Sequence, residues 1–387
     1  MAPKIVLAKA TALNTSANDA ICLVKVSVVM PVFNHETYIS EAINSILLQN
    51  FDSLEIVLVD DGSSDRGIDV ATEILKNAAV PYHIHKQSNL GAHAAINKGI
   101  SLAQGEWIAI LNSDDKFSPS RISRFMDHVI QTNSRFVFSR VSYMDENGLP
   151  LPDTAPHLHY YNWSVDNRDL YPTPNFELLR HNYAITTGNF FFHRSIFERI
   201  GPFRDFKICH DWDFILRALL VTEISFLDEA LYEYRVHPNN TIRPSVQELR
   251  YQEMDALLSN YLRQAETASN PLAPCYKNWG PYWMKFVSSQ IPFGYLPETS
   301  EVIKQILSHP VSDENIILDQ PRQELLAKAL ENSQKKALRL EEELVNTKKY
   351  FESQINKSLP TLVKERLKGR LAGLYSRVTG FFGKKRH

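Results

Sequence analysis

The sequence of 387 residues lacks the features of several common protein classes. Its three cysteines, Cys22, Cys209 and Cys275, are widely spaced and form no CxxC pair. So sparse a set argues against a disulfide scaffold or a cysteine-based metal site and is typical of a reducing cytoplasm. No apolar run reaches the roughly 18 residues that a membrane-spanning helix requires. Because the formal net charge is only −2, we expect no nucleic-acid partner.

Glycine is absent from the loop where two frequent nucleotide-binding motifs would need it. The apolar run at 26–30 is followed at 31–35 by the residues PVFNH. A Rossmann dehydrogenase would carry G-x-G-x-x-G here, and a P-loop protein would carry its own glycine-rich phosphate loop. Both classes are therefore excluded. A nucleotidyltransferase is disfavoured for a similar reason, since it should have a glycine-rich, basic loop at this position.

Strand-like and helix-like segments alternate from residue 26 onward. Short apolar runs, typical of parallel strands covered on both faces, occupy residues 26–30, 55–59, 82–85 and 107–111. Apolar residues at helical spacing predict helices over residues 37–48 and 65–78 and after residue 91. This alternation predicts a doubly wound α/β sheet with right-handed crossovers. The 44% of hydrophobic residues is enough for one large domain of this kind with extensions.

Two acidic clusters directly follow two of these runs. The first begins at Asp60 and reads DDGSSD, and the second begins at Asn112 and reads NSDD. In open α/β sheets, ligands bind at the carboxyl ends of the strands. Carboxylates at that edge suit Mg²⁺ or Mn²⁺, and such an ion usually accompanies a phosphate. The sequence therefore predicts a site for a nucleotide-linked substrate.

A series of motifs in consistent order resembles those of the family 2 glycosyltransferases. The motifs are VSVVMPVFN at 26–34, VDDGSSD at 59–65, NLG at 89–91, SDD at 113–115, GNFFFHR at 188–194, IGPFR at 200–204, HDWDFILR at 210–217 and YRVHP at 234–238. The resemblance covers residues 25–245. It implies the GT-A fold, with a doubly wound mixed sheet, and a non-processive, inverting enzyme of the bacterial type. A processive synthase is disfavoured, because the QxxRW string and membrane spans are absent.

The resemblance assigns most of the first motifs to the nucleotide-sugar donor. Asp60 is similar to the aspartate that contacts uracil in the family, and a carboxylate can accept the N3–H of that base. A UDP-sugar is therefore the favoured donor. The residues alone also allow a turn followed by a helix cap at this position, because Asp, Gly and Ser favour both. The other donor-side residues that the resemblance implies are Pro31, Val32, Phe33, Asn34, Asp61, Asn89, Gly91, Ser113 and Asp114.

Two residues are expected to hold the metal. Asp115 resembles the last carboxylate of the DxD motif, and His237 resembles the C-terminal histidine that completes the metal or diphosphate site. The ion, Mn²⁺ or Mg²⁺, would stabilise the departing nucleoside diphosphate, and a histidine ligand favours Mn²⁺ slightly. His237 is also explained by a surface turn before Pro238.

Asp211 aligns with the catalytic base of the family. A positioned carboxylate suits direct displacement at the anomeric carbon, which predicts inversion. Asp211 is also explained as the N-cap of a helix that starts at Trp212, and both roles are compatible. Gly188 and His210 are expected on the acceptor side. A segment rich in Pro, Tyr and His, residues 151–175, predicts a long loop over the cleft.

The function expected from these motifs is transfer of a sugar, as a hexosyl or N-acetylhexosaminyl group, to a glycan or lipid-linked glycan in cell-surface polysaccharide assembly. The alternative is a non-catalytic scaffold that binds sugar nucleotides or glycans within an assembly complex. Two departures from the family pattern motivate this alternative. His210 stands where the family usually has Glu, and Ile96 stands where many relatives have Arg.

The composition divides the chain into five parts. Residues 1–24 are a lead-in without a signal-peptide pattern, 25–245 the glycosyltransferase domain, 246–320 a helical subdomain, 321–357 a coiled-coil-like helix, and 358–387 a basic amphipathic tail. Apolar residues repeat every seven positions at Leu330, Ala337, Leu344 and Phe351, which predicts a homo-oligomer through residues 325–355. A lone solvated helix is the alternative for this segment.

The tail favours attachment to an anionic membrane surface. Within residues 360–387, apolar residues recur at helical spacing between many lysines and arginines, ending in Phe381 and Phe382. A helix that binds a partner protein, or a seam between subunits, would have the same pattern. The chain is therefore expected in the cytoplasm, peripheral to the inner face of the plasma membrane.

Overall fold

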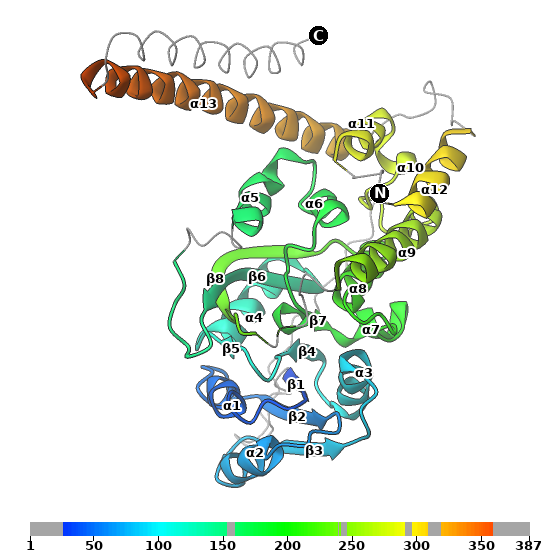
Figure 1. Cartoon of the computed structure of the whole chain (residues 1–387). Coiled ribbons are helices and arrows are strands. Elements are labelled where there is room, and N and C mark those ends of the chain that lie inside the picture. The colour runs from blue at the N-terminus through cyan, green and yellow to red at the C-terminus, as the bar shows by residue number, and fades with distance from the viewer. Residues whose placement is uncertain are drawn as a thin grey trace, which may run out of the picture.

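The computed structural model describes residues 26–152, 159–238, 240, 246–290, 296–308 and 319–358 (Figure 1). The predicted lead-in at 1–24 and the predicted tail from residue 359 onward lie outside these residues. Among the described helices, none combines the length and apolar character that crossing a bilayer requires.

A mixed eight-stranded sheet forms the centre of the molecule, with the strand order β3-β2-β1-β4-β7-β6-β8-β5. The strands are β1 (Val26–Val32), β2 (Leu54–Asp60), β3 (Tyr82–Lys86), β4 (Trp107–Ile110), β5 (Lys116–Phe117), β6 (Phe136–Met144), β7 (Phe191–His193) and β8 (Ser225–Arg235). Strands β1 to β4 are parallel, whereas β7 is antiparallel to both β4 and β6. The predicted doubly wound mixed α/β sheet is confirmed.

The helices of the first half cover both faces of the parallel strands, which is why β1 and β2 are buried along almost their whole length. These helices are α1 (Ile39–Leu47), α2 (Gly67–Lys76) and α3 (Ala92–Leu102), whereas α4 (Arg121–Thr132) contacts β6 and β8. Helices α1 and α2 lie on one side of the parallel strands and α3 on the other (Figure 1). The order in which strands join the sheet therefore reverses between β1 and β4, which are parallel neighbours. At such a switch point a crevice opens at the carboxyl ends of the strands.

The second half is mostly helical. Its helices are α5 (His159–Asn167), η2 (Arg168–Leu170), α6 (Asn175–Arg180), η3 (Thr187–Asn189), α7 (Arg194–Ile200), α8 (His210–Leu219), α9 (Gln247–Ala265), α10 (Tyr276–Trp279), α11 (Pro281–Gln290), α12 (Pro297–Ser308) and α13 (Gln320–Ser358). The prediction of one long loop over 151–175 was wrong, because α5 and η2 lie within it. Helix α8 begins at His210 with Cys209 as its N-cap, so Asp211 lies in the first turn and is not the cap.

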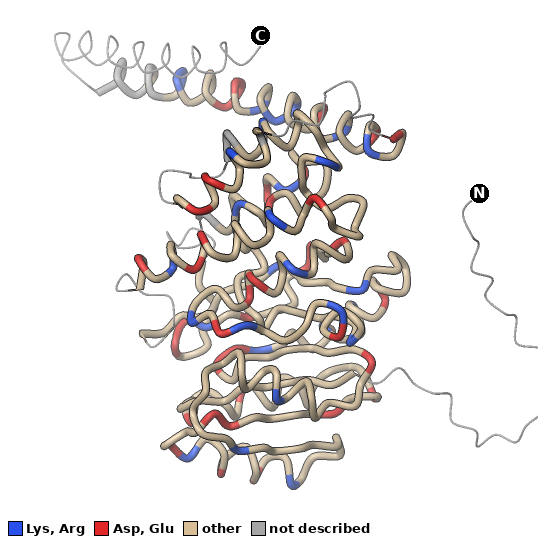
Figure 2. The backbone as a smooth tube through the Cα atoms, turned by 90° about the vertical axis from the view of Figure 1, so that its right-hand side faces the viewer, with Lys and Arg blue, Asp and Glu red and all other residues tan. Residues whose placement is uncertain are grey.

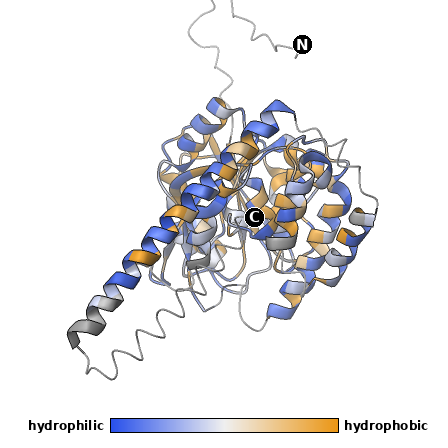
Figure 3. Ribbon diagram, turned by 90° about the horizontal axis from the view of Figure 1, so that it is seen from above, coloured by the Kyte–Doolittle hydropathy of each residue, from blue (hydrophilic) through white to orange (hydrophobic). Residues whose placement is uncertain are grey.

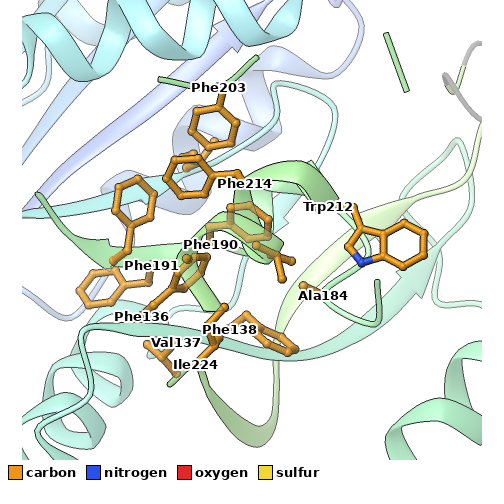
Figure 4. Packing of buried hydrophobic residues seen from close by; sticks show 14 of the residues in the cluster. Phe136, Val137, Phe138, Ala184, Phe190, Phe191, Phe203, Trp212, Phe214 and Ile224 are labelled. Atoms are coloured by element: carbon orange, nitrogen blue, oxygen red, sulfur yellow. The ribbon is translucent and has the colours of Figure 1, made fainter. Parts of the chain in front are cut away.

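A cluster of aromatic side chains fixes α8 against the sheet (Figure 4). Phe214 of α8 stacks on Phe203, with ring centroids 3.9 Å apart and planes 5° apart. Phe214 also contacts Phe192 of β7 and Phe136 of β6. Burying one such ring contributes about 1.5–3 kcal/mol, so the cluster holds the start of α8 at the edge of the sheet.

The first half of helix α13 packs against the rest of the protein, and the second half projects away from it (Figure 3). Ala329 is buried, and Asn332 and Ser333 donate hydrogen bonds to the backbone of η2 at 3.0 Å and 3.4 Å. Leu338 and Leu340, farther along, are exposed. Positively and negatively charged residues are interspersed along the described part of this helix and along the rest of the chain (Figure 2).

Candidate active site

A cavity of about 710 Å³ opens at the carboxyl ends of β1, β2 and β4. It brings together most of the residues that the sequence singled out. Those in its wall are Pro31, Val32, Phe33, Asn34, Asp61, Asn89, Gly91, Ser113, Asp114, His210, Asp211 and His237. Asp60, Asp115 and Gly188 do not line it.

The loops after β1, β2 and β3 are tied to each other by side-chain caps. Asn34 has a left-handed backbone, with φ of 54°, and its Oδ1 accepts a hydrogen bond from the Ser64 N–H at 2.8 Å. Asp61 accepts hydrogen bonds from the N–H groups of Leu90 and Gly91 at 2.9 Å and 2.8 Å. Gly91 has φ of 95°, a conformation that favours glycine. These bonds give the first part of the cavity wall a fixed shape.

Asp60 is placed as a turn residue and not as part of the cavity. Its side chain is buried, and its Oδ1 accepts a hydrogen bond from the N–H of Ser63 at 3.0 Å. This bond agrees with the turn interpretation of the DDGS string. The neighbouring carboxylate, Asp61, lines the cavity.

Among the described residues, His35, Asp114 and His237 form a group whose ligand atoms all lie within 4.8 Å of one another. His237 Nε2 is 3.0 Å from Asp114 Oδ2, and His35 Nε2 is 3.9 Å from the same oxygen. Burial alone would raise the pKa of Asp114, but the hydrogen bond from His237 and the charges of both imidazoles leave it below its ordinary value. Two imidazoles and an ionised carboxylate are a donor set that suits a divalent metal ion.

His35 was not predicted from the sequence. Its Nδ1 lies 2.8 Å from the hydroxyl of Ser113, and this contact orients the ring so that Nε2 faces Asp114. Metal-binding histidines commonly have such a partner on the second nitrogen. Its position just beyond the first strand, at the ligand-binding edge, was the available signal.

Asp115 points away from this cluster into the protein. Its Oδ2 accepts a hydrogen bond from the Tyr232 hydroxyl at 2.6 Å and its Oδ1 accepts one from the Arg235 N–H at 2.8 Å, both from β8. Burial and the nearby charge of Asp114 raise its pKa well above the ordinary value. Asp115 thus packs against β8, and Asp114 is the neighbouring carboxylate that lines the cavity.

Asp211 lies at the cavity wall with both carboxylate oxygens held. Oδ1 accepts a hydrogen bond from the N–H of Trp212, and Oδ2 accepts one from Asn182 Nδ2, each at 2.7 Å. Burial raises the pKa of Asp211 to about 7, although these hydrogen bonds and the charge of Arg250 oppose the shift. A carboxylate with a pKa near neutrality is suited to accept a proton at physiological pH.

His210 also lines the cavity. Burial, and then the charge of His93, lower its pKa to about 4, so its imidazole is neutral at pH 7. A neutral ring replaces the negative charge that a glutamate would supply at this position.

Gly188 is buried by its neighbours and does not line the cavity. A Cβ at this position would lie 1.8 Å from the hydroxyl of Tyr232, which is the group that holds Asp115. The glycine therefore permits close contact between η3 and β8. Nothing in this geometry supports the predicted acceptor role.

A strained segment completes the wall. Ile185 has φ of 73°, a left-handed conformation that is costly for a β-branched residue, by about 1–3 kcal/mol. The segment is held on both sides, because Asn182 donates to Asp211 and Asn112 Nδ2 donates to Thr186 Oγ1 at 2.6 Å. Other lining residues that the sequence did not single out are Tyr38, Thr187, Lys207, Ile208, Tyr234 and Asn240.

The fold is of the GT-A class, and solved structures have the same fold. S. aureus TarS in complex with UDP-GlcNAc superposes with a TM-score of 0.52 at 17% identity, covering 80% of this chain and 89% of that one. The mannosyltransferase PcManGT of Pyrobaculum calidifontis, in complex with GDP-Man and Mn²⁺, gives a TM-score of 0.52 at 15% identity, covering 79% and 84%.

The chain belongs to glycosyltransferase family 2. The family model described as "Glycosyl transferase family 2" matches residues 27–201. The uncharacterized glycosyltransferase EpsJ of Bacillus subtilis is 30% identical over 250 residues, which are 61% of this chain and 69% of EpsJ. The uncharacterized glycosyltransferase RT0329 of Rickettsia typhi is 28% identical over 242 residues, 62% and 72% of the two chains. The prediction of a glycosyltransferase is confirmed.

Proposed function

We propose that the protein is an inverting, metal-dependent glycosyltransferase that moves a hexosyl or N-acetylhexosaminyl group from a nucleotide sugar. The observation that carries this proposal is the presence, in one cavity, of the group His35, Asp114 and His237 and of the carboxylate of Asp211. The first can hold a divalent ion near a diphosphate, and the second can accept the proton of an acceptor hydroxyl.

The favoured donor is a UDP-sugar. Phe33 is an exposed aromatic ring at the cavity, where a base can stack on it. The carboxylate of Asp61 lies in the same wall and offers an acceptor for the N3–H of uracil. This role passes from Asp60 to its neighbour, because Asp60 does not reach the cavity.

The metal site favours Mn²⁺ over Mg²⁺. Mg²⁺ prefers oxygen ligands, whereas imidazole nitrogen suits transition ions. When bound, such an ion supplies positive charge that stabilises the departing nucleoside diphosphate. The chain's own residues orient the site, since Ser113 fixes the ring of His35 and β8 holds the loop through Asp115.

Asp211 would act as the base of a single displacement. Its carboxylate takes the proton of the acceptor hydroxyl as the oxygen bonds to the anomeric carbon and the bond to the nucleoside diphosphate breaks. One displacement from the face opposite the leaving group inverts the anomeric centre. Asn182 and the N–H of Trp212 hold the carboxylate in place.

The proposed acceptor is a glycan or lipid-linked glycan of a cell-surface polysaccharide. The putative teichuronic acid biosynthesis glycosyltransferase TuaG of Bacillus subtilis is 32% identical over 126 residues, which are 33% of this chain and 50% of TuaG. The pathway in the name of TuaG motivates the acceptor class proposed for this chain.

We further propose that the basic segment 360–387 holds the enzyme at the inner face of the plasma membrane, from the cytoplasmic side. The full-length protein should sediment with vesicles that contain anionic phosphatidylglycerol and not with phosphatidylcholine vesicles. Truncation after Leu359 should abolish sedimentation. Equal sedimentation of the truncated protein would contradict this role.

The exposed part of α13 is the proposed site of homo-oligomer formation within 325–355. Leu340, three residues beyond Ala337 of the seven-residue repeat, is exposed. Leu340→Lys should convert any dimer to monomer in light scattering without changing thermal stability. A wild-type monomer at all concentrations would favour the lone solvated helix.

The function is tested with purified protein, Mn²⁺ and a panel of UDP- and GDP-sugars. We expect the wild type to hydrolyse one of these donors slowly. Asp114→Ala and Asp211→Asn should each abolish that hydrolysis. Donor binding without turnover, with or without added glycans, would instead favour the non-catalytic scaffold. Hydrolysis that neither substitution reduces would contradict both the metal site and the base.

A further inference from the structure

A carboxylate from α9 binds the turn that leads into α8, the helix that carries Asp211. Glu253 is 92% buried by its surroundings, with 8% of its surface exposed. Its Oε1 accepts a hydrogen bond from the N–H of Lys207 at 2.7 Å, and its Oε2 accepts two, from Ile208 and Cys209, at 2.9 Å each. Helices α8 and α9 lie side by side in Figure 1 and contact each other.

These three N–H groups belong to the segment that directly precedes α8. The N-cap residue of α8, Cys209, makes no side-chain capping bond. Glu253 therefore holds from a distant helix the N–H of the N-cap residue and those of the two residues before it. The N-cap N–H has no partner within the helix itself. Negative charge at the amino end of a helix is also favourable for the helix dipole.

The segment is part of the active site as well as part of the fold. Lys207, Ile208, His210 and Asp211 all line the cavity. Because Asp211 follows Cys209 by two residues, any movement of the turn would move the carboxylate relative to a bound acceptor. Displacements of about 1 Å at a reacting group can reduce the rate about 100-fold.

We propose that Glu253 is a positioning residue for sugar transfer, which holds residues 207–209 so that Asp211 faces the acceptor hydroxyl. The proposal rests on the proposed role of Asp211 as the base. It gives a function in the reaction to α9, which lies beyond the segment 27–201 that the family model matches.

Helix α9 also contains a matched control. Asp255, two residues farther along and equally buried, accepts hydrogen bonds from the N–H groups of Glu298 and Thr299 at 2.9 Å and 2.7 Å. It thereby holds the start of α12 in the same way that Glu253 holds the start of α8. Asp255 does not line the cavity, so its loss should affect stability without affecting the chemical step.

The experiment compares the wild type with Glu253→Gln, Asp255→Asn and Asp211→Asn in the full-length protein. Donor turnover and UDP affinity are measured with Mn²⁺, and hydrogen exchange is followed by mass spectrometry. Glu253→Gln should lower kcat by about tenfold or more, keep the UDP Kd within about twofold, and speed exchange at residues 205–212. Asp255→Asn should speed exchange at residues 297–300 and keep kcat within about twofold.

Two results would overturn the proposal. One is an unchanged kcat in Glu253→Gln when Asp211→Asn has lost activity. The other is an equal loss of kcat in the Glu253 and Asp255 variants, which would indicate a purely structural role. If Glu253→Gln does not fold, Glu253→Asp, which keeps the charge and shortens the reach, takes its place with the same criteria.

Failure of the proposed function has a different signature. In that case Asp211→Asn itself would remain active, whatever Glu253→Gln does. Hydrogen exchange at 205–212 does not depend on activity, and unchanged exchange there in Glu253→Gln would refute the positioning role on its own.

Discussion

The cavity wall has two parts that are assembled in different ways. The donor part consists of loops that follow β1, β2, β3 and β4, within residues 31–114, together with His237 after β8. The base part combines residues 182–187 with the turn 207–211, and α9 supports that turn. Apart from His237, the first part follows from the order of strands in the sheet, whereas the second depends throughout on contacts between distant segments. The two parts should therefore respond to substitution in different ways.

The largest expected effect belongs to the base part. Asp211→Asn should reduce donor turnover by about 10²–10⁴-fold, the usual range for loss of a general base. Binding of UDP with Mn²⁺, measured by calorimetry, should stay close to that of the wild type. Asp213→Asn, on the same helix, is the control, because Asp213 is paired with Arg217 and should affect the melting temperature more than kcat. If Asp211→Asn lost UDP affinity together with turnover, the base part and the donor part would not be functionally separate.

The donor part should show the opposite pattern. Asp114→Ala removes the carboxylate that both imidazoles face, and should weaken Mn²⁺-dependent UDP binding by about tenfold or more. Asp115→Asn should instead lower the free energy of unfolding by about 1–3 kcal/mol, because the Tyr232 and Arg235 donors lose part of their buried acceptor. Calorimetry and thermal melts separate the two outcomes. If Asp115→Asn abolished Mn²⁺ binding and Asp114→Ala did not, the assignment made from the sequence would be restored.

The pH dependence of turnover sharpens the comparison. Asp211 accepts a proton only when it is ionised, so turnover should rise with pH through its pKa of about 7. Arg250 of α9 lowers that pKa, as do the hydrogen bonds from Trp212 and Asn182. Arg250→Met should therefore move the acidic limb of the kcat profile to higher pH, with a several-fold loss at pH 7 that is recovered at pH 9. Arg263→Met, on the same helix and paired with Glu298, should leave the limb in place. If the acidic limb of the kcat profile did not shift in Arg250→Met, the charge of Arg250 would not determine the pKa of Asp211.

The smallest effect is expected where the two parts meet. Gly188→Ala places a methyl group against Tyr232 and should lower the free energy of unfolding by about 1–3 kcal/mol, the usual cost of overpacking. Gly201→Ala is the control, because its added methyl meets no atom within 4 Å and only its φ of 81° is unfavourable. Chemical denaturation should rank Gly188→Ala as the more destabilising. The reverse order would contradict close packing of η3 against β8.

The sequence predicted the sheet because its signals are local. An apolar run such as 55–59, ended by charged residues and followed by helical spacing, indicates a buried parallel strand without reference to any other segment. The carboxyl ends of such strands share one edge, which is why residues as far apart as Asn34, Asp61 and Ser113 line one cavity. Their roles toward the donor stay predictions.

The sequence did not distinguish between adjacent carboxylates. Asp114 and Asp115 follow the same strand, and so do Asp60 and Asp61 after theirs. Asp115 turns inward because Tyr232 and Arg235, more than a hundred residues later, supply its donors. Asp60 turns inward because its own turn supplies one at Ser63. His35 gave only a weak signal for the same reason, since its partners Asp114 and His237 come from other elements.

The chain by itself determined an α/β sheet with acidic loops at one edge, because strand periodicity and loop composition are properties of short segments. Only the folded molecule decided which carboxylates enter the cavity and how Asp211 is held. Those choices depend on hydrogen bonds from β8, Asn182 and α9, whose positions are set by the packing of residues that are distant in the sequence.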